Sequence, residues 1–331
     1  MSVHPQVQVH LARLAGANFP DLHTFGPERA REGMRRLTRL LPAGEAVAGC
    51  EDRTIETSNG PVNVRIYKPS LDALLPVTVF FHGGGFMLGD LDTHDSLARA
   101  LANASGSIVV SVEYPLAPEH KFPAAPDAAY AATAWVAANA SEFGGDASRL
   151  AVAGDSAGGN LAAVVALLAR DHDGPQLAFQ LLIYPDLDFR RSNFSIRHYA
   201  GKYGNISRET QFWFMDNYLS SEEQRTLATV SPILAGDLTN LPPAYIVSAQ
   251  YDALRDEAEQ YGELLEEAGV AVIVRRWNGM IHEFLRQPFD DSRAAISEAG
   301  QALADALGDR QGAVDRGSDG QLRAAAAGVD S

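Results

Sequence analysis

A serine flanked by glycines is the clearest candidate for chemistry in this sequence. The segment at 150–160 reads LAVAGDSAGGN, in which G-x-S-x-G follows an apolar run and leads into an alanine-rich stretch. This arrangement is typical of a sharp turn from a buried strand into a helix that exposes the hydroxyl of Ser156. A β-carbon at Gly154 or Gly158 would collide with backbone in so tight a turn, and the first helical N–H groups would face any developing negative charge. The pattern predicts Ser156 as a nucleophile.

This segment has two alternative interpretations. A chance G-x-S-x-G in a glycine-rich loop is one, and the position between a strand and a helix argues against it. A phosphate-binding loop is the other, because Gly154 and Gly159 have the G-x-x-x-x-G spacing. That motif requires a lysine where Asn160 stands, and Asp155 would repel a phosphate, so we reject it.

A serine hydroxyl is a weak nucleophile at neutral pH and needs a base, which a carboxylate must orient. Of the nine histidines, only His282 follows the last predicted core strand, in the run GMIHEF at 279–284. Asp252 comes directly after another predicted strand, where the ligands of a parallel sheet gather. Asp256 lies one helical turn further and is the alternative carboxylate. A carboxylate in the first turn of a helix is favoured by the helix dipole, however, so Asp256 needs no catalytic role to account for its presence. The chain order Ser156, Asp252, His282 is that of α/β-hydrolases.

Three successive glycines follow a predicted strand in the run FFHGGGF at 80–86. Glycines leave backbone amides unshielded, as a carbonyl oxygen that becomes an oxyanion requires. We predict that the amides of Gly84, Gly85 and Ala157 form an oxyanion hole. The alternatives are a flexible surface loop and a dinucleotide-binding turn, but Leu88 stands where G-x-G-x-x-G requires its last glycine.

The elements that must position these residues alternate between strands and helices. Continuous apolar runs predict parallel strands buried on both faces, at 77–81, 108–112, 150–153, 181–184, 245–247 and 270–274. Helical stretches lie between them at 96–104, 126–140, 156–169 and 254–268. An alternating pattern before them predicts an antiparallel hairpin that turns at Asn59 and Gly60. The sequence thus predicts a mostly parallel, doubly wound α/β sheet.

We expect a catalytic α/β core at 46–185 and 242–308, and a helical cap formed by 1–45 and 186–241. The two cap segments lack a strand pattern, and the second is rich in aromatic residues that either wall a substrate site or pack internally. Residues 309–331 lack periodicity and predict a disordered tail. The aromatic residues of the second cap segment are Phe189, Phe194, Tyr199, Tyr203, Phe212, Trp213, Phe214 and Tyr218.

Composition limits the classes of function. The 331 residues are 46% hydrophobic and 21% charged, which is typical of a globular protein. The net charge of −15 would repel nucleic acids and anionic membranes. The single cysteine, Cys50, excludes an intrachain disulfide and is expected to be a small packing residue. Without a signal peptide or membrane span, we expect a cytoplasmic protein that takes a small-molecule substrate, with self-association left open.

Taken together, these motifs resemble the bacterial hormone-sensitive-lipase-like esterases, also called family IV, over about residues 50–300. The resemblance implies an α/β-hydrolase fold with a helical cap. It also implies hydrolysis of short to medium acyl esters, often with promiscuity toward aryl esters, and no cofactor or metal is expected. It rests on HGGGF at 82–86, YPLAPEHKFPAA at 114–125, GDSAGGN at 154–160, and the segments around Asp252 and His282.

Two residues depart from the pattern of this family. Pro115 stands where arginine is common, which puts in doubt an ion pair expected near the floor of the site. Glu283 follows His282 where glycine is common, and its carboxylate is expected either to pair with a cap residue or to perturb His282. Two other functions stay open: a ligand-binding pseudoenzyme, against which the intact triad argues, and a lipase activated at oil–water interfaces.

Overall fold

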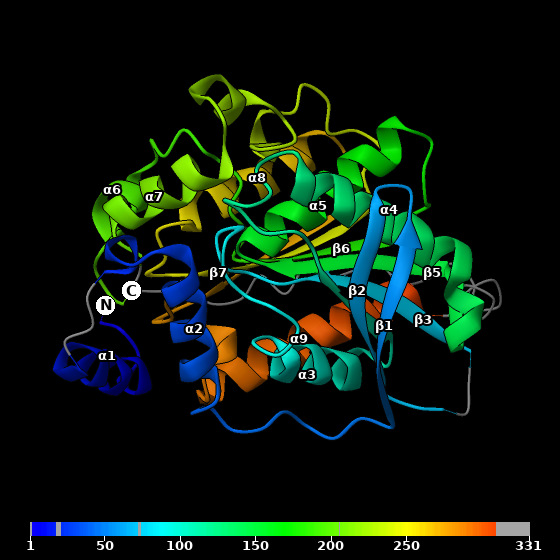
Figure 1. Ribbon diagram of the computed structural model, residues 1–331, viewed down its shortest axis with the longest axis horizontal. Helices are drawn as coiled ribbons and strands as arrows, with labels where there is room; N and C mark the ends of the chain where they lie inside the picture. Colours follow the sequence, from blue (N-terminus) through cyan, green and yellow to red (C-terminus); the bar gives the residue numbers. More distant parts are fainter. Residues whose placement is uncertain (1, 18–20, 72–73, 205, 309–331) are drawn as a thin grey trace, which may run out of the picture.

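An eight-stranded sheet forms the centre of the computed structural model, which describes residues 2–17, 21–71, 74–204 and 206–308 (Figure 1). The strand order is β1-β2-β4-β3-β5-β6-β7-β8. The predicted tail at 309–331 lies outside the described residues. The strands are β1 (Gly49–Thr57), β2 (Gly60–Lys68), β3 (Leu75–Phe81), β4 (Ile108–Glu113), β5 (Gly145–Asp155), β6 (Phe179–Ile183), β7 (Ala244–Ala249) and β8 (Val272–Trp277).

Strand direction confirms the predicted fold class. β2 pairs antiparallel with both β1 and β4, whereas every other neighbouring pair is parallel. The β1–β2 hairpin closes with Thr57 opposite Gly60, so it turns where the sequence predicts. Parallel strands carry their carboxyl ends to one edge of the sheet, and the loops after β3, β5, β7 and β8 hold the predicted site residues.

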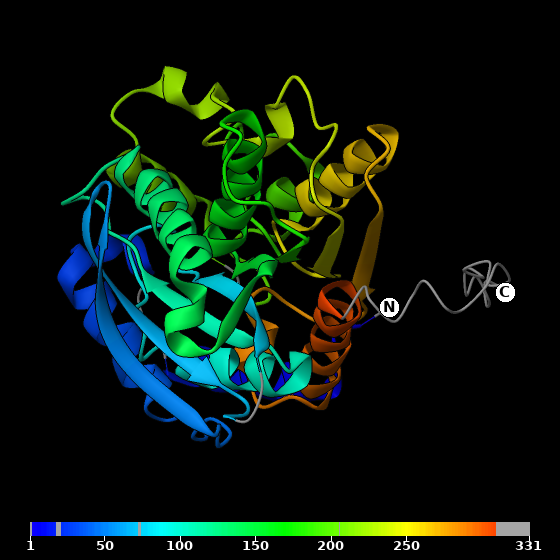
Figure 2. The ribbon, with the colours of Figure 1, turned by 90° about the vertical axis from the view of Figure 1, so that its right-hand side faces the viewer.

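Helices cover both faces of the sheet. α4, α5 and α8 pack on one face and α3 and α9 on the other, so that two apolar clusters sandwich the strands (Figures 1 and 2). None of the described helices combines the length and apolar character needed to cross a bilayer. The helices are α1 (Pro5–Ala17), α2 (Pro27–Thr38), α3 (Asp95–Ser105), α4 (Ala124–Asn139), α5 (Ala157–Asp171), α6 (Phe194–Tyr199), α7 (Arg208–Tyr218), α8 (Arg255–Glu267) and α9 (Asp290–Leu307).

β8 is not buried on both faces, and this part of the prediction is wrong. The strand begins two residues later than the predicted run at 270–274, and Ile273 is 61% exposed. β8 is the last strand of the described sheet, with β7 as its one neighbour, so it lies at the margin of the sheet rather than between two strands. Arg276 pairs instead with Glu259 of α8.

Cys50 lies in β1, at the opposite edge of the sheet, and is exposed rather than packed. Its position on an edge strand explains the difference, because β1 has β2 as its one neighbour. Partial burial raises the pKa of the thiol. Little of it is therefore the reactive thiolate at neutral pH.

The helices of the predicted cap lie over the loops at the carboxyl ends of the strands (Figure 1). His4, the residue before α1, donates its backbone amide to the carbonyl of Gly279 in the loop after β8. In α6, the hydroxyl of Ser195 donates to the carbonyl of Ala253, after β7. The two halves of the cap also meet, because His23 lies 3.1 Å from the hydroxyl of Thr210 in α7. The boundaries between cap and core remain a prediction.

Candidate active site

Ser156 occupies the turn between β5 and α5 with φ 56° and ψ −118°, a conformation that a residue with a side chain rarely adopts. A β-carbon on Gly154 would overlap the carbonyl of Gly158, and one on Gly158 would overlap the carbonyl of Phe81. The amide of Ser156 donates to Ile183 at 2.9 Å, which fixes the turn on β6. The turn therefore holds the serine above the sheet, as the motif predicts.

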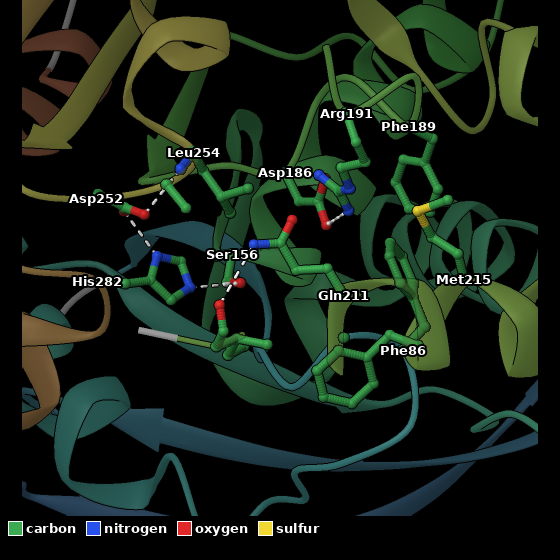
Figure 3. A pocket seen from close by; sticks show the side chains of 14 residues that line it. Phe86, Ser156, Asp186, Phe189, Arg191, Gln211, Met215, Asp252, Leu254 and His282 are labelled. Atoms are coloured by element: carbon green, nitrogen blue, oxygen red, sulfur yellow. Dashed lines mark hydrogen bonds and ion pairs between the residues drawn. The ribbon is translucent and has the colours of Figure 1, made fainter. Parts of the chain in front are cut away.

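His282 and Asp252 lie in line with this serine (Figure 3). Nε2 of His282 is 3.0 Å from Oγ of Ser156, and Nδ1 is 2.7 Å from Oδ2 of Asp252. The other carboxylate oxygen of Asp252 accepts the amide of Leu254 at 2.9 Å. Asp252 is 1% exposed, so the imidazole and one amide hold a carboxylate shielded from water.

Asp256, the alternative carboxylate, has different partners. It lies in the first turn of α8, and its Oδ2 accepts the amide of Ser195 at the start of α6, at 2.7 Å. Its Oδ1 pairs with Arg255 at 2.6 Å. The structure thus brings Asp252 to His282 and uses Asp256 to attach the segment at 193–199 to α8.

The surroundings of His282 favour its protonated form. Burial lowers the pKa of the imidazole, but the charge and hydrogen bond of Asp252, followed by the charge of Glu283, outweigh burial and raise the pKa to about 9. Tyr184 packs edge-on against the ring, with the centroids 5.0 Å apart. An ordinary histidine titrates near 6.5, so these neighbours shift this one well into the alkaline range.

Glu283 raises the pKa of His282 and, among the described residues, has Arg286 rather than a cap residue as its ion-pair partner. It adopts φ 58°, and its carboxylate lies 3.3 Å from Nη1 of Arg286, which follows in the same loop. Arg286 in turn lies 3.4 Å from the hydroxyl of Thr38 in α2. Arg286, rather than Glu283, therefore makes the contact with α2 of the predicted cap.

The glycine run after β3 forms a turn with unpaired amides. Gly84 and Gly85 have φ of 128° and 60°, which side chains rarely tolerate. The carbonyl of Gly84 accepts the amide of Leu88 at 2.8 Å and closes the turn. Within the described ranges, the amides of Gly84, Gly85 and Ala157 have no hydrogen-bond acceptor. These donors are free for a ligand.

Asp155 fixes the base of this turn, a role that its position in the motif does not predict. Its Oδ1 accepts the amide of Gly83 at 2.8 Å, and its Oδ2 lies 3.5 Å from Nε2 of His94. Burial raises the pKa of Asp155, but His94 and the Gly83 amide outweigh burial and hold the pKa below its usual value. The charged carboxylate of Asp155 thus anchors the glycine turn to the serine turn. His82, the residue before Gly83, stacks on Tyr114, and burial lowers the pKa of its imidazole to about 4.

An arginine from α2 forms an ion pair in the segment that follows Pro115. Both Nη atoms of Arg31 pair with the carboxylate of Glu119, at 2.9 and 2.6 Å. Nε of Arg31 donates to the carbonyl of Met87, and Nη2 donates to that of Ala117. One side chain thus joins α2 to the loops after β3 and β4, beside the glycine turn.

A cavity opens beside Ser156; together with the open solvent at its mouth, the space measures about 510 Å³ (Figure 3). Of the eight aromatic residues in the second cap segment, Phe189 and Phe214 line it, whereas Tyr218 stacks behind Phe86 with centroids 4.0 Å apart. Most of the wall is apolar. Its other residues are Gly85, Phe86, Asp186, Arg191, Ile206, Gln211, Met215, Asp252, Ala253, Leu254 and His282.

Comparisons with known proteins agree with this geometry. A family model described as "alpha/beta hydrolase fold" matches residues 78–286. Over 268 residues, 78% of this chain and 82% of each relative, identity is 42% to Esterase LipI and 44% to Carboxylesterase NlhH, both of Mycobacterium tuberculosis. The solved hyperthermophilic esterase of Pyrobaculum calidifontis is 41% identical with a TM-score of 0.89, over 92% of this chain and 99% of that one. The chain therefore belongs to the α/β-hydrolase-fold family, within the hormone-sensitive-lipase-like (family IV) esterases.

Proposed function

We propose that this protein is a serine carboxylesterase that hydrolyses short to medium acyl esters through Ser156, His282 and Asp252. The observation that carries the proposal is the continuous line of hydrogen-bond contacts from Asp252 through His282 to Ser156, beside a largely apolar cavity. The names of the relatives, esterase and carboxylesterase, support the same activity. The substrate is a small-molecule ester.

Acylation begins when Oγ of Ser156 attacks the ester carbonyl carbon while Nε2 of His282 takes the hydroxyl proton. Asp252 holds the imidazole with its proton on Nδ1 and stabilises the imidazolium that forms. The amides of Gly84, Gly85 and Ala157 bind the oxyanion of the tetrahedral intermediate. The intermediate collapses, the bond to the alcohol oxygen breaks, and His282 returns the proton to the leaving alcohol.

Deacylation repeats these steps with water as the nucleophile. His282 removes a proton from water, the resulting hydroxide attacks the acyl carbon, and Ser156 leaves with the proton that His282 returns. The products are a carboxylic acid and an alcohol. No metal or cofactor takes part in this mechanism, and the described ranges contain no cluster of three or more His, Cys, Asp or Glu residues that could hold a metal ion.

The cavity sets the expected acyl length. We expect kcat/KM for p-nitrophenyl acetate, butyrate and octanoate to exceed that for the palmitate, because the aromatic wall formed by Phe86, Phe189 and Phe214 limits the room for a long acyl chain beside Ser156. The measurement is initial rate against concentration across the solubility limit of each ester. Saturation below that limit, with no increase when an emulsion forms, is expected. A jump at the emulsion, or a preference for palmitate, would identify an interfacial lipase instead.

The pH profile should report the charges around His282. Because kcat/KM follows the base in the free enzyme, it should rise through the alkaline range, with a midpoint displaced from 6.5 toward about 9. Glu283→Gln removes a negative charge that favours the imidazolium, so the midpoint should move to lower pH. Glu142→Gln is the matched control, since Glu142 precedes β5 at the opposite end of the strands and is half exposed. An unchanged midpoint in Glu283→Gln would contradict this electrostatic role.

A further inference from the structure

One part of the cavity wall is polar although the proposed reaction does not use it. Gln211 of α7 lines the cavity and is only 6% exposed. Its Nε2 makes a long contact of 3.4 Å with the carbonyl of Ile206, and its Oε1 has no partner in the described part of the chain. A buried acceptor without a donor is costly, and such groups are rare in folded proteins. This side chain is therefore available to a ligand.

The neighbouring residues hold the polar wall in place. Asp186 accepts both Nη atoms of Arg191 at 2.7 Å, and both residues line the same cavity. The amide of Asp186 donates to the carbonyl of Ser156 at 3.1 Å, which connects this segment directly to the serine turn. Glu257, fully buried, accepts the amides of Leu187 and Asp188 and fixes the segment from below. These contacts satisfy most polar groups of the wall; in the described part of the chain, the buried polar atoms of its side chains that lack a partner are Oε1 of Gln211, an acceptor, and Nε of Arg191, a donor.

The position of His282 shows which part of an ester would meet Gln211. The leaving alcohol oxygen must face His282 to receive its proton, so the acyl chain occupies the part of the cavity on the other side of Ser156. Gln211, Arg191 and Phe189 lie on that side (Figure 3). The polar wall therefore faces the acyl group.

We propose that this site prefers esters whose acyl chain carries a hydrogen-bond donor near the carbonyl, namely hydroxyacyl esters, and that Gln211 is the residue that selects them. The proposal rests on the esterase activity proposed above. A hydroxyl can donate to the unpaired Oε1 of Gln211. A methyl group of similar size leaves that oxygen unpaired and buried, and a methoxy group offers it no proton. A site built for a hydrogen bond discriminates against the analogue that lacks it.

The test compares matched ethyl esters. The 2- and 3-hydroxybutanoates are each measured against the methoxy and methyl analogues substituted at the same carbon. At carbon 2 or at carbon 3, kcat/KM for the hydroxy ester should exceed kcat/KM for the methoxy and methyl analogues by about 10-fold. Hydroxyl and methoxy groups withdraw electrons similarly, so a difference between them reports hydrogen-bond donation rather than intrinsic reactivity. No preference at either position, or an equal preference for methoxy, overturns the proposal.

Two substitutions in the cavity wall test whether Gln211 causes the preference for hydroxyacyl esters. Gln211→Met keeps the length of the side chain but removes the acceptor, and the hydroxyl-to-methyl ratio should fall toward one. Met215→Leu changes an apolar residue of the same wall and should leave that ratio unchanged. A ratio that survives in Gln211→Met overturns the proposal. Ethyl butanoate, hydrolysed by the wild-type enzyme, separates the two hypotheses: its hydrolysis without a hydroxyl preference leaves the esterase intact and removes only the selectivity.

Discussion

Ser156→Ala should lose ester hydrolysis and all labelling by a fluorophosphonate probe. Loss of the nucleophile in a serine protease lowers kcat by about 10⁶-fold, and a comparable loss is expected here. The physical reason is that Oγ of Ser156 lies within hydrogen-bond reach of the imidazole of His282, at 3.0 Å, and that the glycine turn after β3 leaves backbone amides free beside it. The measurements are release of p-nitrophenol from the butyrate ester and mass spectrometry of the labelled peptide.

Ser148→Ala is the matched control, because Ser148 is an exposed serine in the same strand, β5. It should remain active and be labelled like the wild type. Failure of the wild type to react, or a label on another residue, would show that the proposed nucleophile is wrong. An inert but folded protein that still binds esters would favour the pseudoenzyme. The strained turn at Ser156 and its contact with His282 argue for reaction at Ser156.

The candidate site was predictable because its main residues carry local patterns. Ser156 has a strained turn that requires glycine on both sides, and this requirement is visible as G-x-S-x-G. Asp252 and His282 each follow a strand, so the topology of a parallel sheet is enough to bring them together. The sheet itself was predictable from continuous apolar runs, since strands buried on both faces have no polar alternation.

Residues that depend on distant parts of the chain were not predictable in this way. Arg31 comes from α2 but contacts Glu119 and Met87, and nothing near it in the sequence indicates those partners. The contact of His94 with Asp155 likewise depends on where the loop after β3 folds back. The exposure of β8 follows from its place at the sheet edge, which an apolar run alone does not reveal.

The predicted helices do not include α9, although its sequence carries a helical pattern. Ala295, Ala299, Leu303 and Leu307 recur at intervals of four residues and are all buried. This spacing places them on one face of a helix, which packs beside α3 under the sheet. Because alanine is only weakly apolar, this stripe contrasts less with its polar neighbours than a row of leucine, isoleucine or valine does.

The two carboxylates after β7 should respond very differently to loss of charge. Asp252→Asn should lower kcat by several orders of magnitude with the fold intact, because an amide can hold the wrong imidazole tautomer and cannot stabilise the imidazolium. In a serine protease this change costs about 10⁴ in kcat. Asp256→Asn should leave kcat near the wild-type value but weaken the contacts with Ser195 and Arg255, at a cost of about 1–3 kcal/mol in unfolding free energy.

Measuring kcat and thermal unfolding for both variants separates catalysis from stability. The two substitutions change the same functional group, four residues apart, so each is the other's control. Asp252 meets Nδ1 of His282 at 2.7 Å, whereas Asp256 meets the amide of Ser195 at the same distance. The two contacts have the same length but different partners, and only the contact with His282 changes during proton transfer, which makes the comparison decisive. A collapse of kcat confined to Asp256→Asn, with Asp252→Asn active, would reverse the assignment.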